Sequence, residues 1–213
     1  MNAMAMDWSC SKKLEARFAT IIRPWMERFG KPLPKDKQYW TMCGKCFKDD
    51  GSRLEHCEFG QLLEHGLIMP SQFHGVDIDP EVIDGNKKAW PGVDWTAGDF
   101  RSAMLACKGF NPGIVNCDTT FRPRRAAQMI GDVMYDLDSV SSGELMLVAN
   151  VVLSIMGITK GDAIRRLSKE GNFMSSWTSG RWEAYKEAVF EYKGSGASDY
   201  STVMGSIVLF RKG

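Results

Sequence analysis

The segment FHGVDIDPEVIDGNKKA, residues 73–89, contains a strand, a turn and a helix in immediate succession. Its first part, FHGVDID (73–79), is a short apolar run that ends in carboxylates, which is typical of a buried strand. Asp79 followed by Pro80 is the pattern of a helix N-cap with proline at the first helical position, so a helix begins there. A strand that leads straight into a helix is the repeating unit of parallel α/β sheets.

The same alternation continues on both sides of this segment. Further strands are expected at 38–44, 93–100, 112–118 and 144–153, and further helices at 57–68, around 104–105, over 126–137 and over 160–171. The strand ELMLVANVVL (144–153) is apolar on both faces, as in a parallel sheet that helices cover on each side. Right-handed crossovers between such strands give a doubly wound, mostly parallel sheet.

The end of the chain follows a different pattern. Two strand-like runs, YKEAVFEYK (185–193) and TVMGSIVLFRK (202–212), are separated only by GSGASDYS. That link is too short for a helical crossover, so we expect an antiparallel hairpin that adds one antiparallel strand to the edge of the sheet. The predicted fold class is therefore α/β, a doubly wound, mostly parallel sheet with a C-terminal antiparallel hairpin.

An N-terminal helix precedes this sheet. Apolar residues recur at spacings of three and four over residues 11–29, which places them on one face of a helix. Pro24 inside this pattern is expected to kink the helix or divide it, and Gly30 to end it. We therefore expect a helical extension over residues 1–37 and one α/β domain over residues 38–213.

The composition is that of an ordinary globular chain with balanced charge. The 213 residues include 27 Lys and Arg against 26 Asp and Glu, so the net charge of +1 creates no overall attraction to nucleic acid or membranes. No apolar run reaches the ~20 residues of a membrane helix, and the N-terminus lacks the pattern of a secretory signal. Six scattered cysteines are typical of reduced thiols, so we expect a cytoplasmic protein without a membrane partner, and homo-oligomers stay open.

Three consecutive strands end in a carboxylate. Asp77, Asp99 and Asp118 follow the second, third and fourth strands, and the carboxyl ends of parallel strands meet at one edge of a sheet. A carboxylate at Asp77 can accept both hydroxyls of a ribose, and one at Asp99 can accept the exocyclic amine of adenine, with Phe100 available to cover the ring. Helix capping is the alternative role for Asp99 and for Asp79.

With these residues the sequence resembles the S-adenosylmethionine-dependent methyltransferase family over most of the predicted α/β domain, and more narrowly small phage-type methyltransferase-like proteins. The segment 73–89 looks like that family's second strand and helix, and VFEYKG and MGSIVLFRK look like its terminal hairpin. The resemblance implies a Rossmann-like fold with S-adenosylmethionine as the cofactor. The cofactor-binding residues that it implies here are Asp77, Ile78, Asp99 and Phe100.

The loop after the first strand departs from the family's pattern. The family usually carries a Gly-rich run with a preceding acidic residue there, which lets the backbone approach the methionine part of the cofactor. Here TMCGKC provides Cys43 and Gly44 at this place, and no acidic residue precedes them. Glu55 and Glu58 are the alternative partners for the methionine amine.

The fourth strand runs into Asp118-Thr119-Thr120-Phe121, which has the spacing of the D-P-P-Y/F motif of amino-group methyltransferases. By that resemblance Asp118 accepts hydrogen bonds from the amine that receives the methyl group, and Phe121 stacks on the base. Threonine replaces both prolines here, which removes two fixed φ angles. An ordinary strand-to-helix turn is the alternative, and Asn116 is a second candidate acceptor for the amine.

A cluster of arginines follows this motif. Arg122, Arg124 and Arg125 are suited to grip a phosphate backbone, so a nucleic acid is one candidate class of substrate. A second basic cluster at 165–169 would extend the patch if it faced the same side. The alternative is that the cluster is only the solvated start of a helix.

Cys43, Cys46 and the pair His56-Cys57 have the spacing of zinc ligands. A lone C-x-x-C with one neighbouring His-Cys pair is a weak signal, so we expect no metal.

The sequence therefore predicts a methyltransferase that acts on a nucleic acid or on another amine-bearing polar substrate. One alternative is a non-catalytic module of the same fold that binds S-adenosylmethionine or nothing. The other is a nicotinamide-dependent oxidoreductase, since an acidic residue after the second strand also suits a ribose. The terminal hairpin and the absence of G-x-G-x-x-G disfavour that second alternative.

Overall fold

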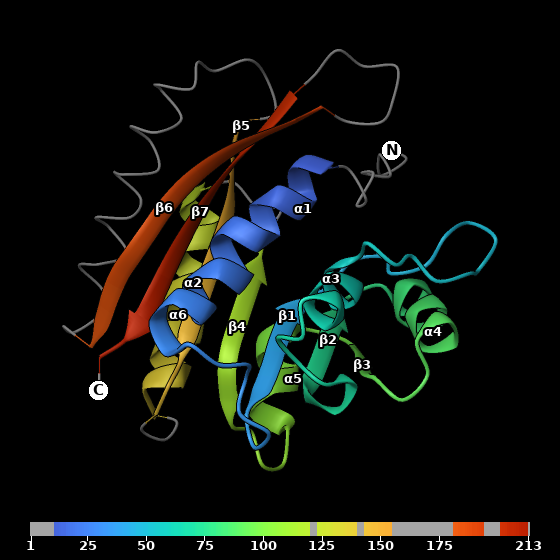
Figure 1. Cartoon of the computed structure of the whole chain (residues 1–213), viewed down its shortest axis with the longest axis horizontal. Helices are drawn as coiled ribbons and strands as arrows, with labels where there is room; N and C mark the ends of the chain where they lie inside the picture. Colours follow the sequence, from blue (N-terminus) through green and yellow to red (C-terminus); the bar gives the residue numbers. More distant parts are fainter. Residues whose placement is uncertain (1–10, 120–122, 140–142, 155–180, 194–200, 213) are drawn as a thin grey trace.

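The computed structural model describes residues 11–119, 123–139, 143–154, 181–193 and 201–212. Its centre is a seven-stranded sheet with the strand order β3-β2-β1-β4-β5-β7-β6. The strands are β1 (Gln38–Met42), β2 (Phe73–Asp77), β3 (Asp94–Ala97), β4 (Pro112–Asp118), β5 (Met146–Ser154), β6 (Trp182–Lys193) and β7 (Ser201–Arg211). β1 to β5 pair in parallel, whereas β7 runs antiparallel to both of its neighbours (Figure 1). The predicted α/β class and the mostly parallel sheet are confirmed.

The C-terminal hairpin corrects one detail of the prediction. Its antiparallel strand is not the edge strand, because β7 lies between β5 and β6. Residues 207–210 of β7 are each at most 2% exposed, so this strand belongs in the covered interior of the sheet. β6 carries Glu183 and Lys186, and charged side chains are typical of an edge strand.

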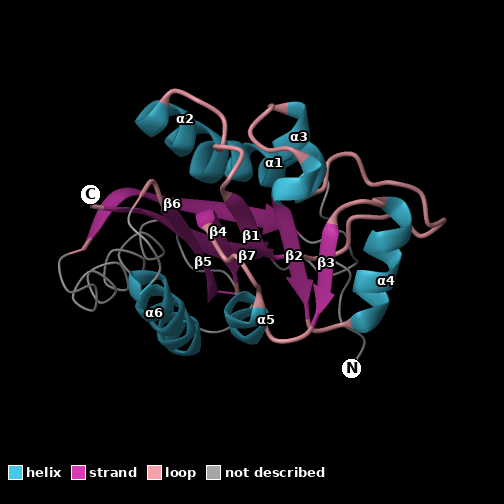
Figure 2. Ribbon diagram, turned by 90° about the horizontal axis from the view of Figure 1, so that it is seen from below, coloured by secondary structure: helices cyan, strands magenta, loops and turns pink. Residues whose placement is uncertain are grey.

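Helices cover both faces of the sheet. They are α1 (Ser11–Arg17), α2 (Arg23–Phe29), α3 (Glu58–Glu64), α4 (Pro80–Ala89), α5 (Phe100–Ala106) and α6 (Pro123–Ser139), with the short turns η1 (Phe18–Ile22) and η2 (Pro70–Gln72). Figure 2 shows α1, α2 and α3 on one face, α5 and α6 on the other, and α4 beside the edge strand β3. Within the described ranges, no helix combines the length and the apolar character that crossing a membrane requires.

Each face of the sheet has its own hydrophobic core. The core under α5 and α6 includes Met104, Ile130, Leu137, Val115 and Leu147. The core on the opposite face includes Trp25, Phe59, Ile83, Phe73 and Ile114. Burial of each such side chain contributes roughly 2 kcal/mol, so the two cores together hold the strand ends in fixed positions.

The N-terminal helix is interrupted at the place that Pro24 predicts. A single π-helical turn, Phe18–Ile22, separates α1 from α2. Pro24 has no N–H to donate to the carbonyl four residues earlier, so the regular α-helical hydrogen bond is missing there. Gly30 ends α2 with a φ of 66°, a left-handed conformation that favours glycine. Trp25 is fully buried, so this segment packs on the sheet, while the domain boundary at residue 37 stays a prediction.

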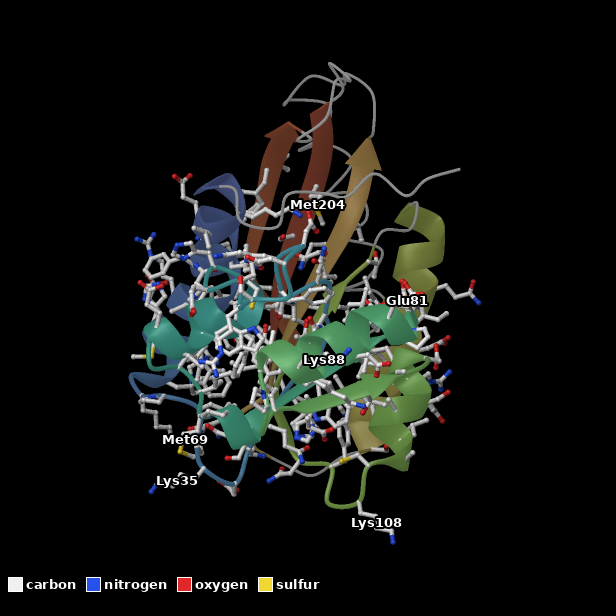
Figure 3. All side chains as sticks on the ribbon, turned by 90° about the vertical axis from the view of Figure 1, so that its right-hand side faces the viewer. Lys35, Met69, Glu81, Lys88, Lys108 and Met204 are labelled. Atoms are coloured by element: carbon white, nitrogen blue, oxygen red, sulfur yellow. The ribbon has the colours of Figure 1, made fainter. Side chains whose placement is uncertain are left out.

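The order of the strands reverses at β1. The chain proceeds from β1 to β2 and β3 on one side, and then returns to β4 on the other side. Figure 3 places Lys35, Met69 and Lys108, which precede β1, β2 and β4, at one end of the molecule, so the carboxyl ends of these strands point toward the opposite end. In open α/β sheets ligands bind outside the carboxyl ends of the strands at such a switch point.

Candidate functional site

A cleft lies at this switch point, between the carboxyl ends of β1 and β4. It is small and partly open to solvent. We call it the β1–β4 cleft. Its lining residues come from α1, the end of β1 and its following loop, the start of α3 and the end of β4: Arg17, Met42, Cys43, Gly44, Lys45, Cys46, Cys57, Glu58 and Asp118.

Glu58 is the buried carboxylate of this cleft, with 7% of its surface exposed. The Tyr39 hydroxyl donates to Glu58 Oε1 at 2.6 Å, and Asn116 Nδ2 donates to the same oxygen at 3.1 Å. Arg17 Nε lies 4.0 Å from the other oxygen, Oε2. Because a buried charge is stable only when it is paired and hydrogen-bonded, these three groups hold the Glu58 carboxylate in one orientation.

Tyr39 is suited to its role as a donor to this carboxylate. Its side chain is fully buried. Burial, and then the negative charge of Glu58, raises the pKa of the Tyr39 hydroxyl well above its ordinary value. The phenol therefore keeps its proton at every physiological pH and always donates to Glu58.

A chain of amide hydrogen bonds links Glu58 to the far strands of the sheet. Asn116, which donates to Glu58, accepts a hydrogen bond from Asn150 Nδ2 at 3.0 Å. Asn150 Oδ1 in turn accepts a hydrogen bond from the Ser206 hydroxyl on β7. The alternative role of Asn116 as an acceptor for a substrate amine is therefore not supported, because its Oδ1 already has a partner and its side chain is buried.

Asp118 ends β4 at the rim of the cleft, as predicted. It is half-buried and faces Asn150 in the register between β4 and β5. Burial, and next the negative charge of Glu58, raises the pKa of the Asp118 carboxyl to about 6, against the opposing positive charges of Lys13 and Arg17. Asp118 is thus a hydrogen-bond acceptor above pH 6 that takes up a proton just below it.

The second strand ends as the sequence predicts. Asp77 is half-buried, and its Oδ1 accepts a hydrogen bond from the backbone N–H of Asp79 at 2.9 Å. Burial raises the pKa of the Asp77 carboxyl. Ile78 lies beside it with 82% of its surface exposed. Asp79 is the N-cap of α4, because its Oδ1 accepts from the N–H of Glu81 at 2.9 Å, so its predicted capping role is confirmed.

After the third strand, Asp99 is a helix cap and Phe100 is a core residue. Asp99 caps α5, since its Oδ1 accepts hydrogen bonds from the N–H and the hydroxyl of Ser102, both at 2.8 Å. These hydrogen bonds lower the pKa of the Asp99 carboxyl. Phe100 is only 6% exposed and belongs to the core under α5 and α6. Its ring is therefore not available to cover an adenine, which corrects the role expected for it.

The three carboxylates lie along the same edge of the sheet. β3 pairs with β2 so that Ala97 faces Asp77, and the N–H of Gly98 donates to the Asp77 carbonyl at 2.9 Å. β1 lies between β2 and β4, and the N–H of Cys43 continues the ladder by donating to the Val76 carbonyl at 2.9 Å. The order along this edge is therefore Asp99, Asp77, the loop after β1, and Asp118.

Three of the four residues expected near the methionine part of the cofactor line the β1–β4 cleft. Cys43 and Gly44 both line the β1–β4 cleft, as expected. Of the two alternative glutamates, Glu58 lies in the cleft, whereas Glu55 is exposed and does not line it. An acidic side chain thus reaches the cleft from the start of α3.

The zinc hypothesis gains no support. In the part of the chain that the structure describes, no three His, Cys, Asp or Glu side chains come together as a metal site. His56 is exposed, and only its backbone carbonyl has a partner near the cleft, the Arg17 guanidinium at 3.2 Å.

The basic cluster after β4 cannot be placed in the same way. Phe121 and Arg122 lie outside the described residues, as does the cluster at 165–169. Arg124 and Arg125 lie in the first turn of α6, but their side chains are also outside the described set. The predictions on an acceptor surface therefore stay predictions.

Arg17 and Asn150 are the site residues that sequence reasoning missed. A signal for Arg17 was present, because it lies three residues after Leu14 and four before Ile21, on the apolar face of the helix. A cation at that position needs a buried partner, which proves to be Glu58. Asn150 interrupts the apolar strand β5, and a partly buried amide inside such a run likewise requires a polar partner.

Comparisons with known proteins agree on the fold. No protein-family model and no curated protein matches the sequence. A solved protein from Thermoplasma acidophilum, called 1320, has a TM-score of 0.53 at 12% identity, over 98% of this chain and 92% of its own. A S-adenosylmethionine-dependent methyltransferase from Anabaena variabilis has a TM-score of 0.52 at 10% identity, over 96% and 87%. TYW2 from M. jannaschii, solved in complex with AdoMet, has a TM-score of 0.51 at 9% identity, over 98% and 79%.

These likenesses concern the course of the backbone. Together with the strand order and the antiparallel β7, they show that the chain has the Rossmann-like fold of S-adenosylmethionine-dependent methyltransferases.

Proposed function

We propose that this protein is a S-adenosylmethionine-dependent methyltransferase whose cofactor lies along the carboxyl ends of β1, β2 and β3. The observation that carries the proposal is the pair of opposite charges, Glu58 and Arg17, in the cleft at the switch point. The amino-acid end of S-adenosylmethionine carries an ammonium and a carboxylate, so it is complementary to this pair.

The fit of the amino-acid end can be assigned residue by residue. Glu58 Oε2 lies 4.0 Å from Arg17 Nε, a distance at which both groups keep capacity for a further hydrogen bond. Glu58 would accept from the ammonium, and Arg17 would donate to the carboxylate. Gly44 lines the same cleft and has no side chain to block the backbone from a ligand. Glu58 thereby replaces the acidic residue that is missing from the loop after β1.

The adenosine end would lie beside β2 and β3. Asp77 is half-buried at the end of β2, where a carboxylate accepts the two hydroxyls of a ribose. Ile78 is exposed next to it and supplies an apolar cover for the base, the role that the buried Phe100 ring does not fill. Asp99 at the end of β3 is exposed and accepts from the exocyclic amine, in addition to capping α5.

The acceptor site would begin at Asp118. When bound, the cofactor supplies a methyl group on a sulfonium, an already activated donor. The protein therefore mainly has to position the acceptor and exclude water. As a half-buried carboxylate, Asp118 accepts a hydrogen bond from an amine and so directs its lone pair into the cleft. We extend the proposal to an amine-bearing polar acceptor, and to a nucleic acid on the strength of Arg122, Arg124 and Arg125 in the sequence.

Measurements of ligand binding and of methyl transfer distinguish this proposal from its two alternatives. We expect S-adenosylhomocysteine to raise the melting temperature of the full chain and NAD to leave it unchanged. Incubation with methyl-labelled S-adenosylmethionine and separate DNA, RNA, protein and small-amine pools is expected to label one pool, with Asp118→Ala as the inactive control. Cofactor binding without label in any pool would leave the non-catalytic module, and a response to NAD alone would leave the oxidoreductase.

A further inference from the structure

Two cysteines of the C-x-x-C and His-Cys motif line the β1–β4 cleft together. Cys46 belongs to the loop after β1, and Cys57 is the N-cap of α3. Both residues line the cleft, and they are 2% and 1% exposed. Both are free thiols.

The backbone holds these thiols close without help from the sulfurs. The N–H of Leu54 donates to the Cys46 carbonyl at 3.1 Å, and the N–H of Cys57 donates to the Leu54 carbonyl at 3.0 Å. On the other side, the N–H of Cys46 donates to Asn86 Oδ1 at 2.7 Å, and Trp90 Nε1 donates to the Cys46 carbonyl at 2.8 Å. The backbones of Cys46 and Cys57 are therefore held close to each other, because both are hydrogen-bonded to Leu54.

The two sulfurs differ in chemical character. Hydrogen bonds from the Cys46 thiol and from the Gly60 N–H, at 3.5 Å, together with the charge of Arg17, lower the pKa of Cys57 against the effect of burial. The hydrogen bond to Cys57, and next burial, raises the pKa of Cys46 well above its ordinary value. Cys57 is thus the more nucleophilic thiol at neutral pH, with Cys46 as its proton-bearing neighbour.

We propose that Cys46 and Cys57 are an oxidation site at which a hydroperoxide converts the two thiols into a disulfide. The Cys57 sulfur attacks one oxygen of hydrogen peroxide, the O–O bond breaks, water leaves, and Cys57 becomes a sulfenic acid. The Cys46 sulfur then attacks the Cys57 sulfur, the S–O bond breaks, and a second water leaves. Two thiols lose two electrons, the peroxide gains them, and both thiol protons end in the two waters.

The position of the pair connects its oxidation to occupation of the cleft. Both residues line the cleft assigned above to the amino-acid end of the cofactor. A ligand there covers the path of peroxide to Cys57, so S-adenosylhomocysteine is expected to slow disulfide formation. This protection rests on the proposed function, whereas the oxidation itself does not.

Peptide mapping of the full chain after hydrogen peroxide treatment tests the site. The wild type is expected to yield the Cys46–Cys57 disulfide, on the order of tenfold faster than any oxidation of Cys117, whose pKa burial raises to about 12. Cys107, which is partly exposed, is the second internal control. Cys46→Ser is expected to stop at a sulfenic acid on Cys57 that dimedone traps, and Cys57→Ser to leave Cys46 reduced.

Different outcomes of the peptide map contradict different parts of the proposal. If Cys46 and Cys57 stay reduced while Cys107 is oxidised, or if either one pairs with a different cysteine, the oxidation site is refuted. The wild-type map alone decides this, so a variant that fails to fold does not matter. If the disulfide forms equally fast with and without S-adenosylhomocysteine, the oxidation site stands and the placement of the cofactor is contradicted.

Discussion

Asn116 on β4 donates a hydrogen bond of 3.1 Å to Glu58 on α3, across 58 positions of the chain. Tyr39 donates to the same oxygen from β1, so one side of the carboxylate is occupied by the protein itself. The other oxygen lies 4.0 Å from Arg17, which also lines the cleft. This arrangement orients the buried Glu58 carboxylate, which the proposal assigns to the ammonium of the cofactor, and the predictions on ligand binding below depend on it.

Substitution of Asp77 is expected to weaken cofactor binding, and substitution of Asp79 to lower the stability of the fold. Asp77→Ala removes the ribose acceptor, so affinity for S-adenosylhomocysteine should fall on the order of 10- to 100-fold. Asp79→Ala removes the N-cap of α4, which costs about 1 kcal/mol of stability and leaves the affinity nearly unchanged. Calorimetric titration and urea unfolding of both variants check this, and equal affinities for the two would remove Asp77 from the site.

Arg17 is expected to recognise only the amino-acid end of the cofactor. Arg17→Gln should weaken S-adenosylhomocysteine at least about tenfold, because one charge-assisted contact to the carboxylate is lost. 5′-Methylthioadenosine lacks that end, so it should bind the variant and the wild type alike. A titration in which both ligands weaken equally would show that Arg17 supports the fold of the cleft and not the ligand.

Asp118 is expected to make stability depend on pH around 6. Its pKa in the folded chain, about 6, exceeds the ordinary value of 3.8, so the folded protein gains stability as pH falls through 6 and loses it as pH rises through 6. Asp118→Asn lacks this change and should be more stable than the wild type above pH 6, by at most roughly 2 to 3 kcal/mol. The advantage should vanish at about pH 4, near the unfolded value.

Urea unfolding at several pH values measures this difference. Asp84→Asn on the exposed face of α4 is the matched control, since it removes one carboxylate outside the cleft. Parallel pH profiles for the wild type and Asp118→Asn would contradict the placement of Asp118 in a buried, negatively charged environment.

Ser206 is expected to affect the fold alone. Ser206→Ala leaves Asn150 Oδ1 without its donor from β7, which should cost roughly 1 to 2 kcal/mol of stability. The Asn150 amide still donates to Asn116, so the orientation of Glu58 should be kept. Unchanged affinity for S-adenosylhomocysteine with a lowered urea midpoint is the expected pair of results. A large loss of affinity would mean that the amide chain transmits strain to the cleft.

The elements that local signals specify were predictable from the sequence. The run FHGVDID and the cap Asp79-Pro80 are read from neighbouring residues, and both β2 and α4 are found where they were expected. Pro24 likewise marks the interruption of the N-terminal helix, because its missing N–H acts locally. The place of β7 between β5 and β6 was missed, because strand order depends on contacts between distant parts of the chain.

The site was only partly predictable for the same reason. Asp77, Asp118 and Gly44 follow strand ends, and the topology alone brings them to one edge. Glu58 was one of two candidates, and only tertiary packing distinguishes it from the exposed Glu55. Arg17 belongs to a helix outside the predicted domain, so no pattern within that domain indicates its part in the cleft.

The most direct test of the cofactor site is calorimetric titration of S-adenosylhomocysteine into the wild type and into Glu58→Gln. Glutamine keeps the shape of the side chain and an oxygen for Tyr39 and Asn116, but removes the negative charge that faces the ligand. We expect the wild type to bind and the variant to bind about 10- to 100-fold more weakly, with both chains folded by circular dichroism. Equal affinity in the two proteins, or no binding by the folded wild type, would contradict a cofactor in the β1–β4 cleft.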